Sequence, residues 1–377
     1  MQLRVTLITE PHVGTDIGKT QAEDARMDKK MTIYTIAEEL GVTPTSVSRA
    51  FNPNSRLSAA KRKLILEAAA KYGFTPNRMA SRLSKREITV GVLIYSRFRQ
   101  FYSELIRGIE DAYEGLKDYK VKCDLRFVDS LEHSALVCND ILDEFAHKKY
   151  DGVIISDLTS DADIDKINAL SEKCGNLVLV NFDSNGIKRL FASIHDIELA
   201  SRTAAEFISV GLTRSKRKNV VLFTDDITAF TQMKAQNAFC AEAESYGMNV
   251  KGIYNVNEFS YRLLKGDKEA ASVLLHGTDG VYVSCGNSMA IAAFIKENGL
   301  SDKLITVTYD LYPELTEYIR SGVITATVFQ NSYMQAKTAF ERLCEHILSG
   351  TEIPSVVYTN FDLVMKNNLG LYERTEL

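Results

Sequence analysis

The sequence predicts an α/β protein with a small all-α head and a larger body of two doubly wound parallel-sheet lobes. Three short helical patterns occupy 35–72, and from Thr89 onward apolar strands alternate with amphipathic helices. Near-continuous apolar strands between helices are typical of parallel sheets that are covered on both faces. The chain has 377 residues, which is more than a single hydrophobic core normally supports. The body is therefore expected to divide into two lobes.

The head reads as helix, tight turn, helix, loop, helix. Thr35 and Glu38 have the spacing of a capping box, which predicts the start of the first helix. A Gly-Val-Thr turn separates it from a second helix over 44–51, whose first residue is a proline that loses nothing by lacking an N–H. Ser58 is placed to cap a third, alanine-rich helix that runs to Tyr72 before a glycine.

The body contains eight apolar runs of strand length. They cover 89–95, 123–128, 152–156, 177–182, 219–223, 280–284, 304–309 and 324–329. Ligands of doubly wound sheets bind beyond the carboxyl ends of the strands. Polar and aromatic residues that follow these strands are therefore candidate ligand contacts.

The charge is distributed unevenly along the chain. Residues 31–90 carry a net charge of +6, whereas residues 91–377 carry −10, and the whole chain carries −4. A basic head on an acidic body predicts a polyanionic partner for the head alone.

The six cysteines form no C-x-x-C pair and do not cluster with the six histidines, which predicts reduced thiols and no metal site. No apolar run approaches the ~18 residues that span a bilayer, and the N-terminus lacks the features of a signal peptide. The sequence thus predicts a cytoplasmic protein without a membrane association.

An enzyme is one alternative, since a doubly wound body can host chemistry. However, the sequence contains no G-x-G-x-x-G after a strand, no Walker loop, no G-x-S-x-G and no H-E-x-x-H. We therefore expect no catalytic residues, no cofactor and no enzymatic activity.

The run IYTIAEELGVTPTSVSRAFNPNSRLSAAKRKLILEAAAKYGFTPNRMASRLSKREITVGVLI resembles the amino-terminal module of LacI/GalR family transcriptional regulators. The segments FYSELIRGIE, VTYD and ATVFQNSYMQA resemble the family's periplasmic sugar-binding-protein-like core, so the resemblance covers about 31–370. It implies a DNA-binding regulator, expected to be a repressor, that binds a near-palindromic double-stranded operator. No leucine-heptad tail follows NNLGLYERTEL, so a homodimer is expected.

The resemblance places the second helix of a helix-turn-helix in the major groove, with Pro44, Thr45 and Arg49 facing base edges. An arginine there can bind guanine O6 and N7 through both guanidinium nitrogens. The expected phosphate or groove-edge contacts are Thr43, Ser46, Ser48, Asn52 and Arg56.

The resemblance also implies a hinge helix in the minor groove. Leu83 occupies the position of an apolar wedge that kinks the duplex. The other residues expected to line this helix are Asn77, Arg78, Ala80 and Arg82.

The family's effector site lies between the lobes, at strand ends. The expected effector contacts are Tyr95, Phe101, Tyr102, Asp183, Asp225, Asn287, Asp310 and Gln330. Asp310 matches the family's carboxylate that binds ligand hydroxyl groups. Asp183 and Asp225 have the alternative role of helix caps beside strands.

Two departures from the family pattern affect the effector class. Ala235 stands where an arginine often precedes the aromatic at Phe239, and Gly286-Asn287 replaces an Asn-Asp pair. A monosaccharide is the default effector, with a phosphosugar, a nucleoside or a disaccharide left open. Two alternatives also stay open: a solute-binding protein of a transport system, and a regulator that responds to a protein corepressor or a non-sugar metabolite.

The sequence and the resemblance together divide the chain into four parts. They are a tail over 1–30, disordered or a mis-assigned start; the helix-turn-helix DNA-binding domain over 31–76; the hinge helix or linker over 77–87; and the effector-binding and dimerisation domain over 88–377. Within the last part, the first lobe is expected over about 88–194 and 329–356, and the second over about 195–328 and 357–377.

Overall fold

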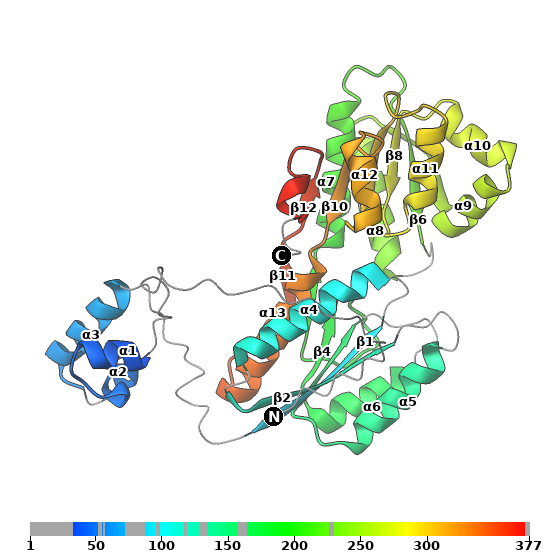
Figure 1. Ribbon diagram of the computed structural model, residues 1–377. Helices are drawn as coiled ribbons and strands as arrows, with labels where there is room; N and C mark the ends of the chain where they lie inside the picture. The colour runs from blue at the N-terminus through cyan, green and yellow to red at the C-terminus, as the bar shows by residue number, and fades with distance from the viewer. Residues whose placement is uncertain are drawn as a thin grey trace, which may run out of the picture.

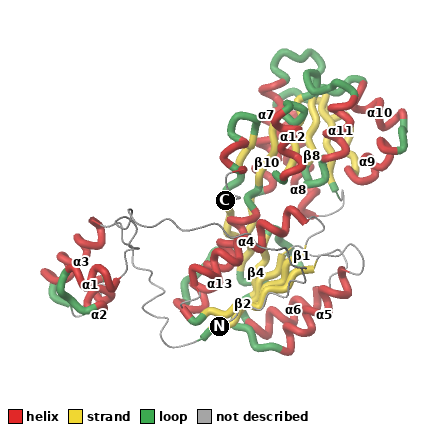
Figure 2. Tube along the Cα trace, in the orientation of Figure 1, coloured by secondary structure: helices red, strands yellow, loops and turns green. Residues whose placement is uncertain are grey.

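The computed structural model describes residues 33–51, 55, 57–71, 87–95, 99–116, 119–128, 134–156, 164–225 and 230–373 (Figure 1). The expected tail over 1–30 lies outside these residues, as does the expected hinge helix over 77–87 except for its last residue. Within them, a three-helix head precedes a body of two sheets with helices on both faces (Figure 2). The predicted α/β class with two doubly wound lobes is confirmed.

The head consists of α1 (Ile33–Glu39), α2 (Pro44–Ala50) and α3 (Ala59–Lys71). One side chain from each helix, Ile36, Val47 and Ile65, is fully buried at the centre of the head. Because the three helices share one small core, the exposed face of α2 is held at a fixed angle to the other two helices.

Two of the three helix caps predicted for the head are present in the structure. Thr43 accepts a hydrogen bond from the Ser46 backbone N–H at 3.2 Å, and α2 begins at Pro44 as predicted. Ser58 likewise accepts from the Lys61 N–H, at 3.4 Å. The capping box at Thr35 is wrong, because α1 already includes Ile33 and Thr35 therefore lies inside the helix.

The first lobe is built on a wholly parallel sheet in the order β11-β5-β4-β3-β1-β2. Its strands are β1 (Ile88–Tyr95), β2 (Val121–Val128), β3 (Gly152–Ser156), β4 (Leu177–Val180), β5 (Phe191–His195) and β11 (Val356–Thr359). On one face lie α4 (Arg99–Leu116) and α13 (Ser332–Ser349), and on the other α5 (Ser134–His147) and α6 (Ile164–Cys174). The central strands β1, β3, β4 and β5 are buried between these two helix layers, whereas the edge strands β2 and β11 are partly exposed.

The second lobe repeats the arrangement in the order β12-β10-β9-β8-β6-β7, with only β12 antiparallel. Its strands are β6 (Asn219–Thr224), β7 (Asn249–Asn255), β8 (Gly280–Val283), β9 (Ile305–Tyr309), β10 (Ala326–Phe329) and β12 (Asp362–Val364). Its helices are α7 (Ile197–Gly211), α8 (Phe230–Ser245), α9 (Val256–Leu264), α10 (Lys268–Leu275), α11 (Met289–Glu297) and α12 (Pro313–Arg320), followed by a short 3₁₀ turn, Leu369–Leu371.

All eight predicted strands are present, and the described residues form four further strands that the sequence pattern did not predict. β7 is an edge strand whose side chains alternate between exposed and half-buried, so it lacks a continuous apolar run. β5 (FASIH) has its apolar run interrupted by Ser193 and ended by His195, and β11 and β12 are short strands that are mostly half-buried, so none of the three has a continuous apolar run. The chain crosses between lobes after β5, after β10 and after β11, and the expected lobe boundary at 356 falls on the first residue of β11.

Gly108 permits the close packing of α4 against α13. A Cβ at this position would lie 2.3 Å from the backbone oxygen of Tyr333, which cannot move aside as a side-chain end can. We expect Gly108→Ala to lower the free energy of unfolding by about 1–3 kcal/mol, as overpacking does in dense cores. Gly115→Ala in the same helix is the matched control.

The control meets no atom within 4 Å, so the gain in helix propensity should stabilise the protein by up to about 1 kcal/mol. Urea denaturation of the two variants measures both effects. Equal stability of the two variants would contradict the close packing at Gly108.

Candidate functional site

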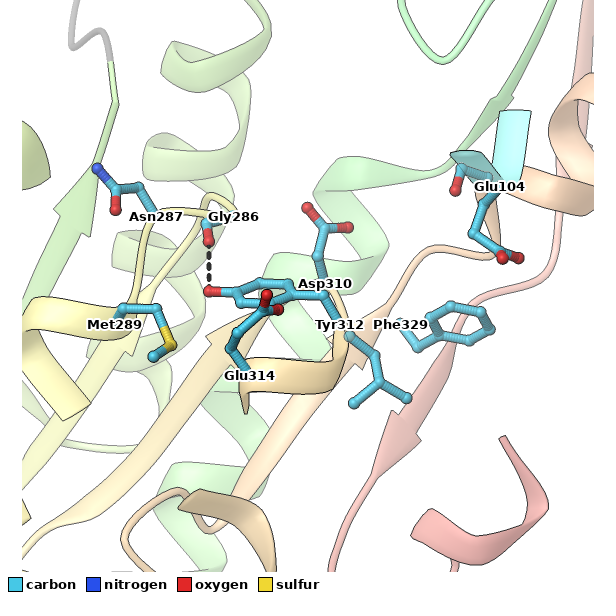
Figure 3. Close-up of a pocket in the computed structure, with 10 residues that line it drawn as sticks. Glu104, Gly286, Asn287, Met289, Asp310, Tyr312, Glu314 and Phe329 are labelled. Atoms are coloured by element: carbon cyan, nitrogen blue, oxygen red, sulfur yellow. Dashed lines mark hydrogen bonds between the residues drawn. The ribbon is translucent and has the colours of Figure 1, made fainter. Parts of the chain in front are cut away.

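A pocket of about 240 Å³ lies between the two lobes, at the carboxyl ends of β8, β9 and β10 (Figure 3). Most of its lining comes from the second lobe, while Glu104 on α4 and Ser332 on α13 come from the first. Among the described residues, the lining consists of Glu104, Gly286, Asn287, Met289, Asp310, Leu311, Tyr312, Glu314, Phe329 and Ser332. A concave site of this kind, with an apolar wall and a few polar groups, is suited to a small ligand.

Asp310 is fixed in the pocket by its backbone. Its φ of +66° lies in the left-handed region, which aspartate tolerates better than most residues. Its N–H donates to the Val328 carbonyl at 2.8 Å, and its own carbonyl accepts from the Thr327 hydroxyl at 2.5 Å. Burial raises the pKa of its carboxyl group to about 6, against the opposing effect of a hydrogen bond from Gln330.

A chain of hydrogen bonds joins Asp310 to the first lobe. Gln330, on the connection from β10 to α13, donates through Nε2 to Asp310 Oδ1 at 2.6 Å. Its Oε1 accepts from Asn181 Nδ2 at 2.8 Å, and Asn181 follows β4 in the first lobe. Gln335 supports both, since its Nε2 donates to the Gln330 carbonyl at 2.8 Å and its Oε1 accepts from Asn181. A group that moves Asp310 therefore also acts on the other lobe.

Gly286 has a steric role beside Asp310. A Cβ at Gly286 would lie 3.1 Å from Asp310 Oδ2, so a side chain here would crowd the carboxylate. The Tyr312 hydroxyl donates to the Gly286 carbonyl at 2.9 Å and fixes the tyrosine ring against the pocket (Figure 3). The departure from the family pattern at Gly286 thus coincides with a close approach of the backbone to the Asp310 carboxylate in the pocket.

The structure brings three of the sequence-predicted effector residues together. Asp310 and Asn287 line the pocket, and Gln330 contacts Asp310 from behind. Asn287 also donates to Asn257 Oδ1, which in turn lies beside Asp225: the Asn257 amide donates to Asp225 Oδ1 at 2.5 Å. Asp225 therefore belongs to a polar group next to the pocket.

Two other predicted residues are engaged in internal contacts. Asp183, after β4, receives two hydrogen bonds of 2.5 Å from the Arg189 guanidinium. Tyr95 ends β1 with its side chain in the core of the first lobe, and its N–H donates to the Ser156 hydroxyl at 2.9 Å. Phe101 and Tyr102 lie in the first turn of α4, and their side chains are outside the described part of the chain.

Several pocket residues were not predicted from the sequence. Tyr312 and Glu314 follow Asp310 by two and four residues, so the strand-end position that identified Asp310 could also have indicated them. Glu104 follows the predicted aromatic pair on the same helix. Asn181 is harder to identify from the sequence, because the feature that distinguishes it, a left-handed φ of +71°, is seen only in the folded backbone.

The head presents a polar surface on α2. Thr43, Thr45 and Arg49 are exposed, whereas Pro44 and Ser46 are half-buried. The Arg49 carbonyl accepts from the Ser55 hydroxyl at 2.6 Å, which ties the end of α2 to the following loop. Outside the described residues lie the Ser48 side chain and the predicted contacts Asn52, Arg56, Asn77, Arg78, Ala80, Arg82 and Leu83.

None of the helices in the ranges above is long and apolar enough to cross a membrane. In the same part of the chain, no group of three or more His, Cys, Asp or Glu side chains is placed to hold a metal ion.

Two family models match the chain, one over the body and one over the head. The family described as "Periplasmic binding protein domain" matches residues 90–352. The family described as "Bacterial regulatory proteins, lacI family" matches residues 32–77.

Curated relatives carry the name catabolite control protein A. The protein from Priestia megaterium is 37% identical over 125 residues, which span 33% of this chain and only 36% of that protein. The protein from Staphylococcus aureus (strain Mu50) is 24% identical over 269 residues, covering 66% of this chain and 78% of the relative. The Staphylococcus xylosus protein is 23% identical over 277 residues, covering 70% and 82%.

Solved structures share the fold of the body. A glucose-galactose binding protein from Geobacillus stearothermophilus is 20% identical with a TM-score of 0.63, covering 76% of this chain and 99% of that one. An arabinose binding protein from the same organism is 18% identical, with a TM-score of 0.65 and coverage of 76% and 99%. A putative LacI transcriptional regulator from Bacteroides fragilis is 15% identical, with a TM-score of 0.64 and coverage of 76% and 100%. The chain, with its DNA-binding helix-turn-helix head and its periplasmic-binding-protein-like body, therefore belongs to the lacI family of bacterial regulatory proteins and is a transcriptional regulator.

Proposed function

We propose that the protein is a cytoplasmic repressor that binds a near-palindromic operator as a homodimer and whose operator affinity is set by a sugar-like effector between its lobes. The observation that carries the effector control is the hydrogen-bond chain from Asp310 through Gln330 to Asn181. A ligand that contacts Asp310 changes the interactions between the lobes, and it can therefore shift the equilibrium between two lobe arrangements.

The dimer is supported by an exposed apolar surface on the second lobe. Tyr261 and Leu264 on α9 are 62% and 79% exposed, and Ile253 on the neighbouring edge strand is 40% exposed. Burying them against a second copy would join two chains and so supply the two heads that a near-palindrome requires. Sedimentation equilibrium tests this step, and the mass of a single chain would remove the dimer from the proposal.

The test of DNA binding is Arg49→Ala. Arg49 is exposed on α2, where we propose that it binds a guanine edge. With an operator selected from random duplex DNA, the variant is expected to bind about 10- to 100-fold more weakly and to lose preference at one base pair of each half-site.

The matched control is Lys63→Ala on α3, an exposed cation 3.9 Å from Glu67. It removes the same charge from the head and should leave base preference unchanged. Fluorescence anisotropy at fixed salt measures both variants, since affinity for DNA depends strongly on salt. Wild-type base preference in Arg49→Ala would refute the assignment.

The hinge contributes a second prediction, at Leu83. We propose that the paired leucines of a dimer wedge one base step, and that the lobe arrangement decides whether the hinge helices pack together. Leu83→Ala should weaken operator binding by about tenfold or more, because a buried leucine contributes roughly 2 kcal/mol. Effector affinity of the DNA-free protein should not change, and unaltered operator binding would remove the wedge from the proposal.

A further inference from the structure

The connection from α7 to β6 contains a strongly basic turn over 214–218. Four of these five residues are cations: Arg214, Lys216, Arg217 and Lys218. The body to which this basic turn belongs is acidic, with a net charge of −10 over 91–377. Like charges that are concentrated in one place repel one another and destabilise the folded state. Natural proteins accept such a local cost mainly where function requires it.

The basic turn lies at the end of the second lobe that is opposite the inter-lobe pocket (Figure 1). It precedes the first residue of β6, whereas the pocket lies at the carboxyl ends of β8, β9 and β10. Because β6, β8 and β9 are parallel, the amino end of β6 is at the far edge of the sheet from the pocket. A partner bound to the basic turn therefore leaves the pocket and the crossovers between the lobes free.

Hydrogen bonds from two sides hold the basic turn in one conformation. The Ser215 N–H donates to the Leu212 carbonyl at 2.9 Å, and the Asn249 N–H donates to the Lys218 carbonyl at 2.9 Å. Lys218 has a φ of +50°, in the left-handed region that lysine rarely adopts. The neighbouring strand β7 thus supports a backbone conformation that the lysine itself disfavours. Because the turn is preformed, a partner does not have to order it on binding.

Most of the charge of the basic turn is not neutralised within the chain. Arg217 Nη2 lies 3.2 Å from Asp279 Oδ1, and even this arginine side chain is 61% exposed. The other three cations form no ion pair within the part of the chain that the structure describes. Of these three, Arg214 and Lys216 are exposed. The positive charge is therefore available to an anionic partner.

A nucleic-acid duplex is the polyanion that suits the basic turn best. Duplex DNA carries one charge per about 1.7 Å of its axis, and contact with lysine and arginine releases counterions without any reading of bases. An extended acidic peptide carries at most one charge per about 3.3 Å, so its attraction to the same cations is weaker. Since the head of the same chain binds DNA, neighbouring DNA is present at a high effective concentration, and a few phosphate contacts suffice.

We propose that the basic turn is a second, sequence-independent DNA contact, which binds the phosphates of a duplex segment other than the operator. The head joins the first lobe at β1, whereas the basic turn lies at the far end of the second lobe, so the two contacts reach different segments. The protein thereby holds two segments of DNA together. This inference goes beyond the proposed function and takes from it only that the head binds an operator.

Fluorescence anisotropy of the full chain with two duplexes tests the inference. The heads are first filled with excess unlabelled operator, which they bind far more tightly than other DNA. A labelled random duplex of about 20 base pairs is then titrated at several salt concentrations. The labelled duplex is expected to bind the operator-filled wild type, with an affinity that falls as the salt concentration rises.

The variant that carries both Arg214→Gln and Lys216→Gln removes two exposed cations from the basic turn. Its affinity for the labelled duplex at about 50 mM salt should be at least about tenfold lower than that of wild type. The slope of log affinity against log salt should be smaller by about 1.8, because two phosphate contacts are lost. Its operator affinity should not change, which shows that the protein is folded.

The matched control carries Lys268→Gln and Lys366→Gln. Both lysines are exposed on the second lobe outside the basic turn, and the control makes the same change in net charge. It should keep the wild-type affinity and the wild-type slope. If the control loses as much affinity as the turn variant, the effect comes from net charge alone and the inference is wrong.

The remaining outcomes separate this inference from the proposed function. If the labelled duplex does not bind operator-filled wild type, or binds the turn variant equally well, the inference is overturned and the operator-binding regulator stays in place. Polyglutamate that displaces the labelled duplex as well as an equal charge of unlabelled random duplex would assign the basic turn to an acidic protein instead. If no operator can be selected, the proposed function fails, and the slopes of the turn variant and the control on the unfilled protein still decide the inference.

Discussion

Asp310→Asn is expected to raise the free energy of unfolding at pH 7.5 by about 3 kcal/mol while removing the response to effector. Burial raises the pKa of this carboxyl group from 3.8 to about 6, so the ionised form destabilises the folded protein at neutral pH. Asparagine carries no charge, and its Oδ1 can still accept the hydrogen bond from Gln330. The site thus retains a destabilising charge, which is the usual sign of a functional group.

The sign of this effect follows from the raised pKa. Between about pH 4 and 6 the folded protein holds a proton on Asp310 that the unfolded chain has lost, so the ionisation penalty develops as the pH rises and is complete above 6. The gain in Asp310→Asn should therefore be full at pH 7.5 and disappear near pH 4. Urea denaturation at both values measures it.

Asp302→Asn is the matched control, because Asp302 is exposed just before β9 and its replacement should change stability by less than about 0.5 kcal/mol. The second half of the prediction is measured as effector-induced thermal stabilisation, which should be lost in Asp310→Asn and kept in Asp302→Asn. An Asp310→Asn protein less stable than wild type at pH 7.5 would show that the carboxylate contributes favourable contacts that outweigh its burial.

The parts of the fold that the sequence predicted are those with a strong local pattern. The eight strands with continuous apolar runs and the three helices of the head are each recognisable within a window of about ten residues. The edge strand β7 was missed because it has no continuous apolar run: Lys251 and Ile253 are exposed and alternate with residues that are only half-buried. Thr35 was misread because a capping-box spacing can also occur inside a helix.

The candidate site was predictable only where a residue follows a strand. That rule led to Asp310 and Gln330, and the resemblance to the family added Asn287; the structure places the three together. It could not indicate that Asn181 reaches Gln330, since these residues are 149 positions apart and meet only because the two lobes pack. Nor could it distinguish Asp183, because its ion pair with Arg189 depends on how the loop after β4 folds.

A second contact between the two lobes is the buried pair of His195 and Tyr309, near the point where the chain crosses from one lobe to the other. The two residues end β5 and β9, one strand in each lobe, and the Tyr309 hydroxyl is hydrogen-bonded to His195 Nε2. The other ring nitrogen, Nδ1, has no hydrogen-bond partner among the described residues. Burial lowers the pKa of His195 to about 4, although the nearby Asp196 acts in the opposite direction.

We expect His195 and Asp310 to give the protein opposing pH dependences over nearly the same range. The unfolded chain binds a proton at His195 near pH 6.5 while the folded protein resists it until about pH 4, so stability from this residue falls as the pH drops through that window. Stability from Asp310 rises over about the same interval. Each shift corresponds to about 3 kcal/mol, and in the wild type the two largely cancel.

Single replacements should reveal the two slopes separately. Asp310→Asn should lose about 3 kcal/mol between pH 6.5 and 4 relative to wild type, because only His195 then titrates. His195→Gln should instead gain stability as the pH falls from 6 to 4, through Asp310 alone. His147→Gln, at an exposed histidine near the end of α5, should keep the wild-type profile. Urea denaturation across this pH range gives the free energy of unfolding of all four proteins. If wild type and His195→Gln show parallel curves of stability against pH, His195 is protonated as readily in the folded protein as in the unfolded chain, and the prediction is wrong.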